Sequence, residues 1–304
     1  PPMGVDDAAA EAALSRFSEP VREWFTSSFR APTPPQVAGW PAIADGDHTL
    51  ILAPTGTGKT LSAFLWALDR LAVEPVPDDE QQRTRVLYLS PLRALAVDVE
   101  KNLRAPLMGI GFAAERGGEA VHTPSVGIRT GDTPTKDRRQ LIRHPPDILI
   151  TTPESLYLML TSKARETLAN VQHVIIDEIH AMAGTKRGAH LMLSLERLEE
   201  ITAAPPQRIA LSATQRPLDE IARFLGGSTA APDGTLTPRA VTVVDAGARK
   251  ELDIEVIVPI DDMGALGERV EAPIDGPAAA SPGRRSIWPS IHPRLLELIE
   301  DHHS

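Results

Sequence analysis

One stretch, residues 53–60, constrains the fold of this chain more than any other, and it reads APTGTGKT. It lies between an apolar run, 49–52, and a helical pattern that starts at Leu61. Glycines let the backbone turn so tightly that several N–H groups converge at a helix N-terminus, where the helix dipole favours an anion. Lys59 adds a positive charge, and the Thr60 hydroxyl can bind Mg²⁺. The stretch therefore predicts a phosphate-binding loop.

The loop departs from the general pattern at one position, where Ala53 replaces a glycine. A glycine- and threonine-rich surface turn is the alternative. The strand before the loop and the helix after it favour phosphate binding, because the mechanism requires both. The residues expected to bind the nucleotide here are Thr55, Gly56, Thr57, Gly58, Lys59 and Thr60.

Composition limits the class of protein. A length of 304 residues is typical of about two domains. The sequence has no run of about 18 apolar residues and no charged-then-apolar leader, so we expect no membrane partner. It has no cysteine, which excludes disulfides and thiolate metal sites and fits a cytoplasmic protein. The net charge of −10 argues against a surface made entirely for nucleic acid, without excluding a local basic groove.

Apolar strands alternate with helical patterns along most of the chain. A helix over 14–29 would bury Phe17, Val21, Trp24 and Phe25, and a short helix over 36–44 leads to a strand at 48–52. Further strands are expected at 86–89, 126–128, 148–151, 171–176, 209–211 and 241–244, and helices at 59–73, 92–108, 136–143, 153–160 and 188–202. This order predicts an α/β fold, a mostly parallel sheet covered by helices on both faces. Such sheets bind ligands at the carboxyl ends of their strands.

The two ends of the chain differ from this pattern. Residues 1–13 are rich in Ala, Asp and Glu and are expected to be flexible or loosely helical. We expect one domain over 14–248 and a linker over 249–292, of which 261–285 has the Pro- and Gly-rich composition of a disordered insertion. A helix over 293–300 would begin a second domain.

A carboxylate pair, Asp177 and Glu178, follows the apolar strand that ends at Ile176. One carboxylate there can hold Mg²⁺ while its neighbour orients and deprotonates an attacking water. We assign the metal, shared with Thr60, to Asp177 and the general base to Glu178. An exposed pair that caps a turn is the alternative, and the phosphate loop upstream favours the site.

Six segments in this order resemble the first RecA-like domain of a superfamily 2 helicase of the DExH kind. They are 32–36 (Q motif), 53–60 (motif I), 90–95 (motif Ia), 151–155 (motif Ib), 177–180 (motif II) and 212–214 (motif III). The longer stretch 177–190, DEIHAMAGTKRGAH, is similar to the large helicase-related (Lhr) family. The likeness extends from Phe17 to the last residue.

The resemblance implies roles for residues that chemistry alone leaves open. Gln36, with Thr33, would read the adenine edge, which makes ATP the expected nucleotide. Without the family, Gln36 is equally an ordinary helix N-terminal residue. Ser212 and Thr214 would couple the nucleotide site to strand movement, although they could also form a helix N-cap. His180 would link motif II to motif III or to a partner domain, whereas alone it is an ordinary surface histidine.

Nucleic acid is the partner that the resemblance implies. Such helicases hold the backbone of one strand, which needs hydroxyls, backbone N–H groups and a few arginines. The candidates, all at or just after the carboxyl ends of expected strands, are Arg93, Arg129, Thr130, Gly131 and Thr152. The two arginines could instead be solvated charges. Residues 136–139 are interpreted as a solvated helix face, and the histidines show no spacing for a structural metal.

The expected function is that of an ATP-dependent motor domain on single-stranded nucleic acid, commonly 3′ to 5′ in the resembling family. DNA, RNA and a DNA/RNA hybrid remain open as substrates. The family completes its ATP site with arginines from a second RecA-like domain and has further C-terminal modules, so this chain alone should bind ATP and Mg²⁺ weakly and hydrolyse ATP poorly. A nucleic-acid-binding module without ATP turnover is the alternative. A transporter-type ATPase is disfavoured, because no Leu-Ser-Gly-Gly-Gln signature is present.

Overall fold

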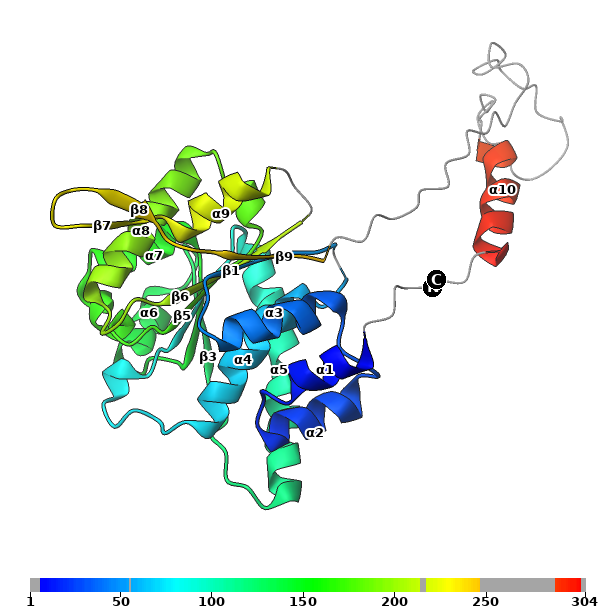
Figure 1. Ribbon diagram of the computed structural model, residues 1–304, viewed down its shortest axis with the longest axis horizontal. Helices are drawn as coiled ribbons and strands as arrows, with labels where there is room; N and C mark the ends of the chain where they lie inside the picture. Colours follow the sequence, from blue (N-terminus) through cyan, green and yellow to red (C-terminus); the bar gives the residue numbers. More distant parts are fainter. Residues whose placement is uncertain (1–5, 55, 214–216, 247–287, 302–304) are drawn as a thin grey trace, which may run out of the picture. The chain divides into compact units, whose positions relative to one another are not determined.

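The computed structural model describes residues 6–54, 56–213, 217–246 and 288–301 (Figure 1). The chain divides into two compact units, Pro1–Ala248 and Arg249–Ser304. In the second unit the structure describes one helix, α10 (Trp288–Asp301), where the sequence predicts a helix over 293–300. Two of the expected site residues, Thr55 and Thr214, and the expected insertion at 261–285 lie outside the described residues.

A sheet of seven parallel strands forms the centre of the first unit, in the order β3-β4-β2-β5-β6-β1-β9. Its strands are β1 (Thr49–Leu52), β2 (Val86–Leu89), β3 (Val126–Arg129), β4 (Ile148–Thr151), β5 (His173–Ile176), β6 (Gln207–Ser212) and β9 (Thr242–Asp245). A separate antiparallel pair joins β7 (Ser228–Ala230) to β8 (Leu236–Pro238). The predicted parallel α/β fold is confirmed.

Helices cover both faces of this sheet. One face packs against α3 (Pro34–Ala44), α4 (Lys59–Val73) and α5 (Arg93–Gly117), and the same hydrophobic cluster includes α1 (Asp7–Leu14), which packs on α3, and α2 (Glu19–Ser28), which packs on α5. The other packs against α7 (Pro153–Leu160), the 3₁₀ helix η2 (Lys163–Leu168), α8 (Lys186–Ile201) and α9 (Leu218–Gly226). Helix α6 (Thr135–Arg143) contacts the edge strand β3, and η1 (Glu80–Gln82) and η3 (Ile179–Ala181) are short 3₁₀ turns.

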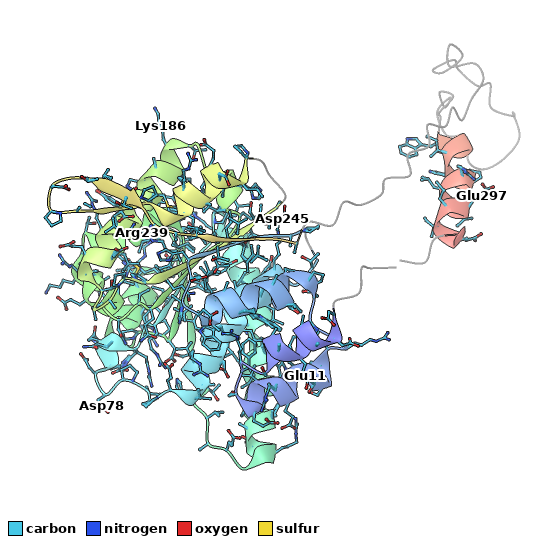
Figure 2. The ribbon with its side chains drawn as sticks, in the orientation of Figure 1. Glu11, Asp78, Lys186, Arg239, Asp245 and Glu297 are labelled. Atoms are coloured by element: carbon cyan, nitrogen blue, oxygen red, sulfur yellow. The ribbon has the colours of Figure 1, made fainter. Side chains whose placement is uncertain are left out.

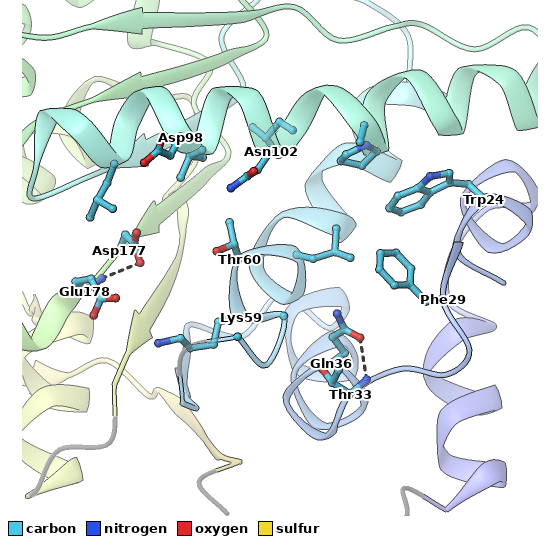
Figure 3. A pocket seen from close by; sticks show the side chains of 18 of the residues that line it. Trp24, Phe29, Thr33, Gln36, Lys59, Thr60, Asp98, Asn102, Asp177 and Glu178 are labelled. Carbon is cyan, nitrogen blue, oxygen red and sulfur yellow. Dashed lines mark hydrogen bonds between the residues drawn. The ribbon is translucent and has the colours of Figure 1, made fainter. Parts of the chain in front are cut away.

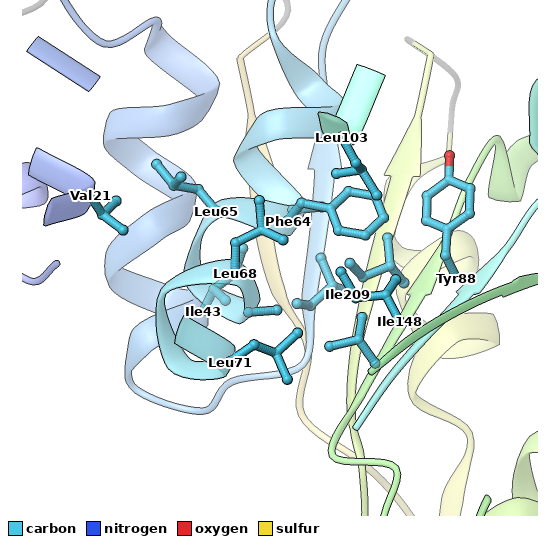
Figure 4. Close-up of a cluster of buried hydrophobic side chains, with 14 of the residues drawn as sticks. Val21, Ile43, Phe64, Leu65, Leu68, Leu71, Tyr88, Leu103, Ile148 and Ile209 are labelled. Atoms are coloured by element: carbon cyan, nitrogen blue, oxygen red, sulfur yellow. The ribbon is translucent and has the colours of Figure 1, made fainter. Parts of the chain in front are cut away.

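Strand residues alternate between the two hydrophobic clusters. Ile51 and Tyr88 pack under α4 and α5, whereas Leu50 and Leu87 pack under the helices of the opposite face. Figure 4 shows Phe64 of α4 beside Tyr88 in the first cluster. Because the side-chain period of a strand is two, this register buries both faces. Charged side chains such as Glu11, Asp78 and Lys186 point outward (Figure 2).

The N-terminal helices differ from the sequence expectation. In place of one helix over 14–29, α1 ends at Leu14 and α2 begins at Glu19. The break contains Ser18, whose backbone N–H donates to the buried carboxylate of Asp69 at 3.1 Å. Helix α1, which is capped by Asp6 and packs on α3, lies in the segment expected to be flexible or loosely helical. The four residues expected to be buried in this region are all buried.

Two further helices depart from prediction. Helix α5 continues from the expected end at Met108 to Gly117, because Ile110 and Ala113 add buried contacts and Gly118, with φ +74°, supplies the C-cap. Helix α9 was not predicted. Its sequence is nine residues long, and only packing of Ile221 and Leu225 against the second cluster distinguishes it from a loop.

Candidate nucleotide-binding site

The glycine loop joins β1 to α4 and packs against the start of α3. Gly56 and Gly58 have φ angles of +83° and +78°, in the left-handed region that glycine adopts without strain. A Cβ atom on Gly58 would lie 2.9 Å from the Gln36 side-chain nitrogen. The positive φ favours glycine at position 58, and the close approach shows that the loop packs against the segment expected to read adenine.

The Lys59 side chain is buried without a partner. It is 8% exposed, and its Nζ atom makes no hydrogen bond or ion pair within the described part of the chain. Burying an ammonium group that has no counter-charge is costly. Lys59 lines a pocket of about 710 Å³, shown in Figure 3. The arrangement is suited to an anionic ligand that would supply the missing partner.

The pocket brings together expected residues from three separate segments. Besides Lys59, the pocket is lined by these residues that the sequence predicted for the nucleotide site: Thr33, Gln36, Gly56, Gly58, Thr60, Asp177 and Glu178. Thr57 does not line it; its hydroxyl instead donates to the Pro54 carbonyl at 2.7 Å and braces the loop. The structure thus places motifs separated by more than a hundred residues around one cavity.

Among the lining residues that were not predicted for the site are two aromatic and two polar side chains. Trp24 and Phe29 form an aromatic wall beside Gln36, with ring centroids 5.8 Å apart and nearly perpendicular. Asp98 and Asn102 enter from α5 (Figure 3). Phe29 precedes the Pro-rich Q-motif segment by only a few residues, a signal that could have been used. No sequence signal placed α5 over the loop, because that depends on how two helices pack.

Gln36 has a structural role as well as a place in the pocket. Its Oε1 atom accepts a hydrogen bond from the Thr33 backbone N–H at 2.9 Å, which caps the N-terminus of α3. The helix N-terminal interpretation therefore describes its geometry correctly. The amide still has its Nε2 donors and a second lone pair on Oε1 for a ligand. The two readings of Gln36 are compatible.

Both carboxylate oxygens of Asp177 are held by the protein. Oδ2 accepts from the Tyr88 hydroxyl at 2.5 Å, and Oδ1 accepts from the Glu178 backbone N–H at 3.0 Å. Tyr88 itself stacks on Phe64 with centroids 5.1 Å apart. Burial, and then the negative charge of Asp177, raise the pKa of the Tyr88 hydroxyl, so it stays a protonated donor. These contacts fix the orientation of Asp177 at the pocket.

Glu178 has an unusual backbone conformation. Its φ of +46° makes it the one non-glycine residue with positive φ in the described ranges, and such conformations occur at strained functional positions. The left-handed turn starts η3 and brings Glu178 Oε2 to 3.2 Å from His180 Nδ1. The turn directly after β5 therefore leaves the Glu178 carboxylate at the pocket.

His180 connects the segments that follow β5 and β6. Its Nδ1 atom lies 3.3 Å from both the Ser212 hydroxyl and the Ala213 backbone N–H. One ring nitrogen carries either a proton or a lone pair, so Nδ1 can accept from Ala213 or donate to Glu178, but not both at once. The geometry brings the proposed coupling residues His180 and Ser212 into contact.

The pocket offers oxygen ligands that suit Mg²⁺. The Thr60 hydroxyl and the Asp177 carboxylate both line it, and hard oxygen donors are what this ion prefers. Nowhere in the described ranges do three or more His, Asp or Glu side chains form a group that could hold a metal. Protein ligands alone are thus few here, which fits an ion that would also be held by phosphate oxygens.

The expected nucleic-acid residues gather at the carboxyl ends of neighbouring strands β2, β4 and β3. Arg93 pairs with Asp132 and lies over Gly131, where a Cβ atom would be 2.7 Å from Arg93 Nη2. Arg138 donates to the Thr130 and Gly131 carbonyl oxygens at 3.3 and 2.6 Å. Arg138 is therefore not simply part of a solvated helix face.

Arg129, Thr130 and Thr152 of this group are buried. Arg129 is 9% exposed, and its Nη1 atom has no hydrogen-bond partner within the described ranges. Burial lowers the pKa of Arg129, and the nearby charge of Arg138 adds to this. The Thr152 hydroxyl accepts from the Ser155 N–H at 3.4 Å, at the N-terminus of α7. Thr152 thus caps α7, and any contact with a nucleic-acid strand would have to be compatible with that hydrogen bond.

The fold and the site together define a class of protein. Residues 33–221 match the DEAD/DEAH box helicase family, and this region contains the glycine loop, the carboxylate pair and the Q-motif residues. The chain belongs to the DEAD/DEAH box helicase family. It carries the RecA-like helicase domain of that family.

The predicted resemblance to the large helicase-related family is confirmed. The chain is 53% identical to the Lhr helicase/probable uracil glycosylase of Mycolicibacterium smegmatis over 96% of its length, and 48% identical to the Lhr helicase/uracil glycosylase of Escherichia coli over 95%. It covers 18% of each of those proteins. The structure of Mycobacterium smegmatis helicase Lhr bound to ssDNA and AMP-PNP is 52% identical, with a TM-score of 0.74, and the match covers 96% of this chain and 34% of that one.

The chain thus spans about a fifth of the length of these curated relatives. Among the helices that the structure describes, none is both long and apolar enough to cross a membrane.

Proposed function

We propose that this chain is the ATP-binding motor domain of an ATP-dependent helicase or translocase. The observation that carries the proposal is the buried, unpartnered Lys59 ammonium in a pocket that also contains Gln36, Asp177 and Glu178. A nucleoside triphosphate fits this pocket chemically, because its phosphates would pair with Lys59 and the loop N–H groups. The aromatic wall of Phe29 and the Gln36 amide would hold the adenine.

Thr60 and Asp177 are the proposed ligands of Mg²⁺. The bound ion would neutralise charge on the phosphates. Glu178, whose carboxylate reaches the same pocket, would accept the proton of the attacking water. His180 would sense the state of Glu178 through Nδ1 and transmit it to the segment at Ser212. Asp177 would remain fixed throughout, because Tyr88 and the Glu178 N–H hold it.

Single-stranded nucleic acid is the proposed partner. Arg93, Arg129, Thr130, Gly131 and Thr152 would contact its backbone along the carboxyl edge of β2, β4 and β3. Single-stranded DNA and 3′ to 5′ movement are proposed from the Lhr resemblance, and the similar Lhr structure is of a protein bound to ssDNA. Contacts to the backbone would also admit RNA or a hybrid.

A second RecA-like domain and further C-terminal modules are proposed to complete the motor, since the relatives are several times longer than this chain. Arginines from that second domain would stabilise the transferred phosphoryl group, an effect of about 10³ to 10⁵ in rate. The 304-residue chain is accordingly proposed to bind ATP weakly and to hydrolyse it slowly by itself.

The test is ATP turnover in a protein that continues past Ser304 into the second motor domain. Rates are measured with and without single-stranded DNA or RNA, for the wild type, for Glu178→Gln and for the control Glu220→Gln on the exposed face of α9. We expect nucleic acid to stimulate the wild type and Glu178→Gln to lower turnover about 10²- to 10⁴-fold. Equal rates in the wild type and Glu178→Gln would favour the alternative, a nucleic-acid-binding module without ATP turnover.

A further inference from the structure

Asp98 is a carboxylate in the nucleotide pocket that the proposed mechanism does not use. It lies on α5 and has no hydrogen-bond or ion-pair partner among the residues that the structure describes. Glu100, two residues along the same helix, does not line the pocket and pairs with Arg104 at 2.8 Å. Figure 3 shows Asp98 and Asn102 projecting from α5 toward the side of the pocket that contains Thr60 and Asp177.

The charges around the pocket are unbalanced for a polyphosphate. The charged side chains that line it are Asp98, Asp177, Glu178 and Lys59, three carboxylates and one ammonium. Asp177 is assigned to the metal and Glu178 to the water, which leaves Asp98 without a role. A carboxylate next to a phosphate chain is repulsive. Asp98 is therefore compatible with the ligand only if positive charge lies between them.

The buried Lys59 Nζ atom is the independent sign that this cavity takes a charged ligand, since it has no partner in the described part of the chain. The three carboxylates do not converge closely enough to form a group that could hold an ion by themselves. Mg²⁺ dehydrates reluctantly and usually keeps several of its waters. A carboxylate at the rim of such a site reaches the ion through those waters.

The helix α5 presents more than one acceptor at this position. Asp98 and Asn102 are four residues apart, so they lie on the same helix face. Pro106, which also lines the pocket, has no N–H, and the backbone carbonyl of Asn102 consequently lacks its intrahelical donor. Water molecules of a hydrated ion donate hydrogen bonds, and the Asp98 carboxylate and the Asn102 amide oxygen can accept them.

We infer that Asp98, assisted by Asn102, accepts hydrogen bonds from the waters of the Mg²⁺ that accompanies the nucleotide. Asp98 is thus a positioning residue for the metal–nucleotide complex, contributed by α5 opposite Thr60 and Asp177. The inference rests on the proposed ATP-binding function. It predicts that Asp98 favours the metal-bound nucleotide and disfavours the free one.

The test is AMP-PNP binding by calorimetry with excess Mg²⁺ and, separately, with EDTA. The proteins are the wild-type chain, Asp98→Asn and the matched control Glu100→Gln, which removes the same charge from the same helix outside the pocket. We expect Asp98→Asn to weaken binding about tenfold in Mg²⁺, the size typical of lost outer-shell partners of metals. In EDTA its affinity should equal or exceed that of the wild type, because a repulsive charge has been removed. Glu100→Gln should match the wild type in both media.

Other outcomes overturn the inference. An equal loss in Mg²⁺ and EDTA would show that Asp98 contacts the nucleotide itself. No change, or the same gain in both media, would make Asp98 a bystander. A wild type that binds AMP-PNP with a clear Mg²⁺ requirement, beside an unchanged Asp98→Asn, contradicts this inference alone. A wild type that shows no binding in Mg²⁺ contradicts the proposed function as well. Circular dichroism verifies that the exposed, isosteric Asp98→Asn change leaves the fold intact.

Discussion

Two buried cations, one near the amino ends and one near the carboxyl ends of the parallel strands, have opposite surroundings. Arg208, near the amino end of β6, is 1% exposed and donates to Glu196, Glu199 and two backbone carbonyls. Arg239, labelled in Figure 2, pairs with the same two carboxylates. Lys59, beyond the carboxyl end of β1, is almost as buried and has no partner in the described ranges.

The difference shows that the partners of a buried charged side chain indicate whether it stabilises the fold or could bind a ligand. At the amino edge the chain itself supplies the counter-charges, so Arg208 serves the fold. At the carboxyl ends of the strands, the residues that the structure describes offer Lys59 no counter-charge, which is the basis for proposing an anionic ligand there. The exposed fraction does not distinguish Arg208 from Lys59, whereas the number of hydrogen-bond and ion-pair partners does.

Replacing Arg208 should have the largest effect on stability. Arg208→Met removes four hydrogen bonds and leaves the Leu225 and Gly226 carbonyls without this donor, so we expect the free energy of unfolding to fall by about 3 kcal/mol. Urea denaturation measures this. Arg16→Met, which breaks an exposed ion pair with Asp45, is the control and should cost under about 1 kcal/mol. Equal losses would remove the basis for the comparison.

Replacing Lys59 should have the opposite effect, with ligand affinity lowered and the free energy of unfolding preserved. Lys59→Met removes an unpaired buried charge, so the free energy of unfolding without ligand should not fall. AMP-PNP affinity should fall roughly tenfold to a hundredfold, the effect of losing a hydrogen bond to a charged group. Denaturation and calorimetry on the same preparations test both halves. A stability loss as large as that of Arg208→Met would mean that Lys59 has a structural partner.

Tyr88→Phe tests whether the hydrogen bond from the Tyr88 hydroxyl positions Asp177 for metal binding. The change keeps the ring on Phe64 but removes the donor to Asp177 Oδ2. We expect the Mg²⁺ concentration for half-maximal AMP-PNP binding to rise about tenfold, with affinity in EDTA unchanged. Phe64→Leu, which alters packing without touching Asp177, controls for the ring contact. A Mg²⁺ dependence that shifts equally in both variants would show that Tyr88 acts only through packing.

The smallest expected effect is a pH dependence at the amino edge. Burial lowers the pKa of His173, and its hydrogen bond to Gln207 opposes this only in part. The unfolded chain then binds a proton before the folded chain does, so stability should fall as pH drops below about 6.5. His173→Gln should make the fall shallower, by at most about 1.4 kcal/mol per pH unit. His48, whose pKa is also lowered chiefly by burial, leaves a residual slope. An identical slope in the variant would exclude His173 as its source.

Local patterns predicted the elements that have strong, regular signals. The strands Val86–Leu89 and Ile148–Thr151 and the helices Lys59–Val73 and Pro153–Leu160 have the expected bounds, since each combines an uninterrupted apolar pattern with a clear stop. The continuation of α5 beyond Met108 and the whole of α9 were missed. Their residues have marginal local preference and become helical because a hydrophobic cluster receives them.

The candidate site divides in the same way. The loop at 53–60 and the pair Asp177 and Glu178 could be recognised because their chemistry depends on residue order within a few positions. The place of Trp24 beside the pocket, the acceptors of α5 and the hydrogen bond from Tyr88 to Asp177 could not. Each depends on which segments the fold brings to the same cavity. The spacing of residues along the sequence does not show how close two distant segments lie in space.

The sequence by itself determined the parallel α/β fold, the family, and the residues of the phosphate loop and the carboxylate pair. These follow from short-range periodicity and from chemistry that is complete within a few residues. Only the tertiary structure decided that Lys59 is buried without a partner among the described residues, that Gln36 caps α3 while facing the pocket, and that Asp98 lines the same pocket. These properties depend on contacts between distant segments, where packing selects among arrangements that local patterns leave equal.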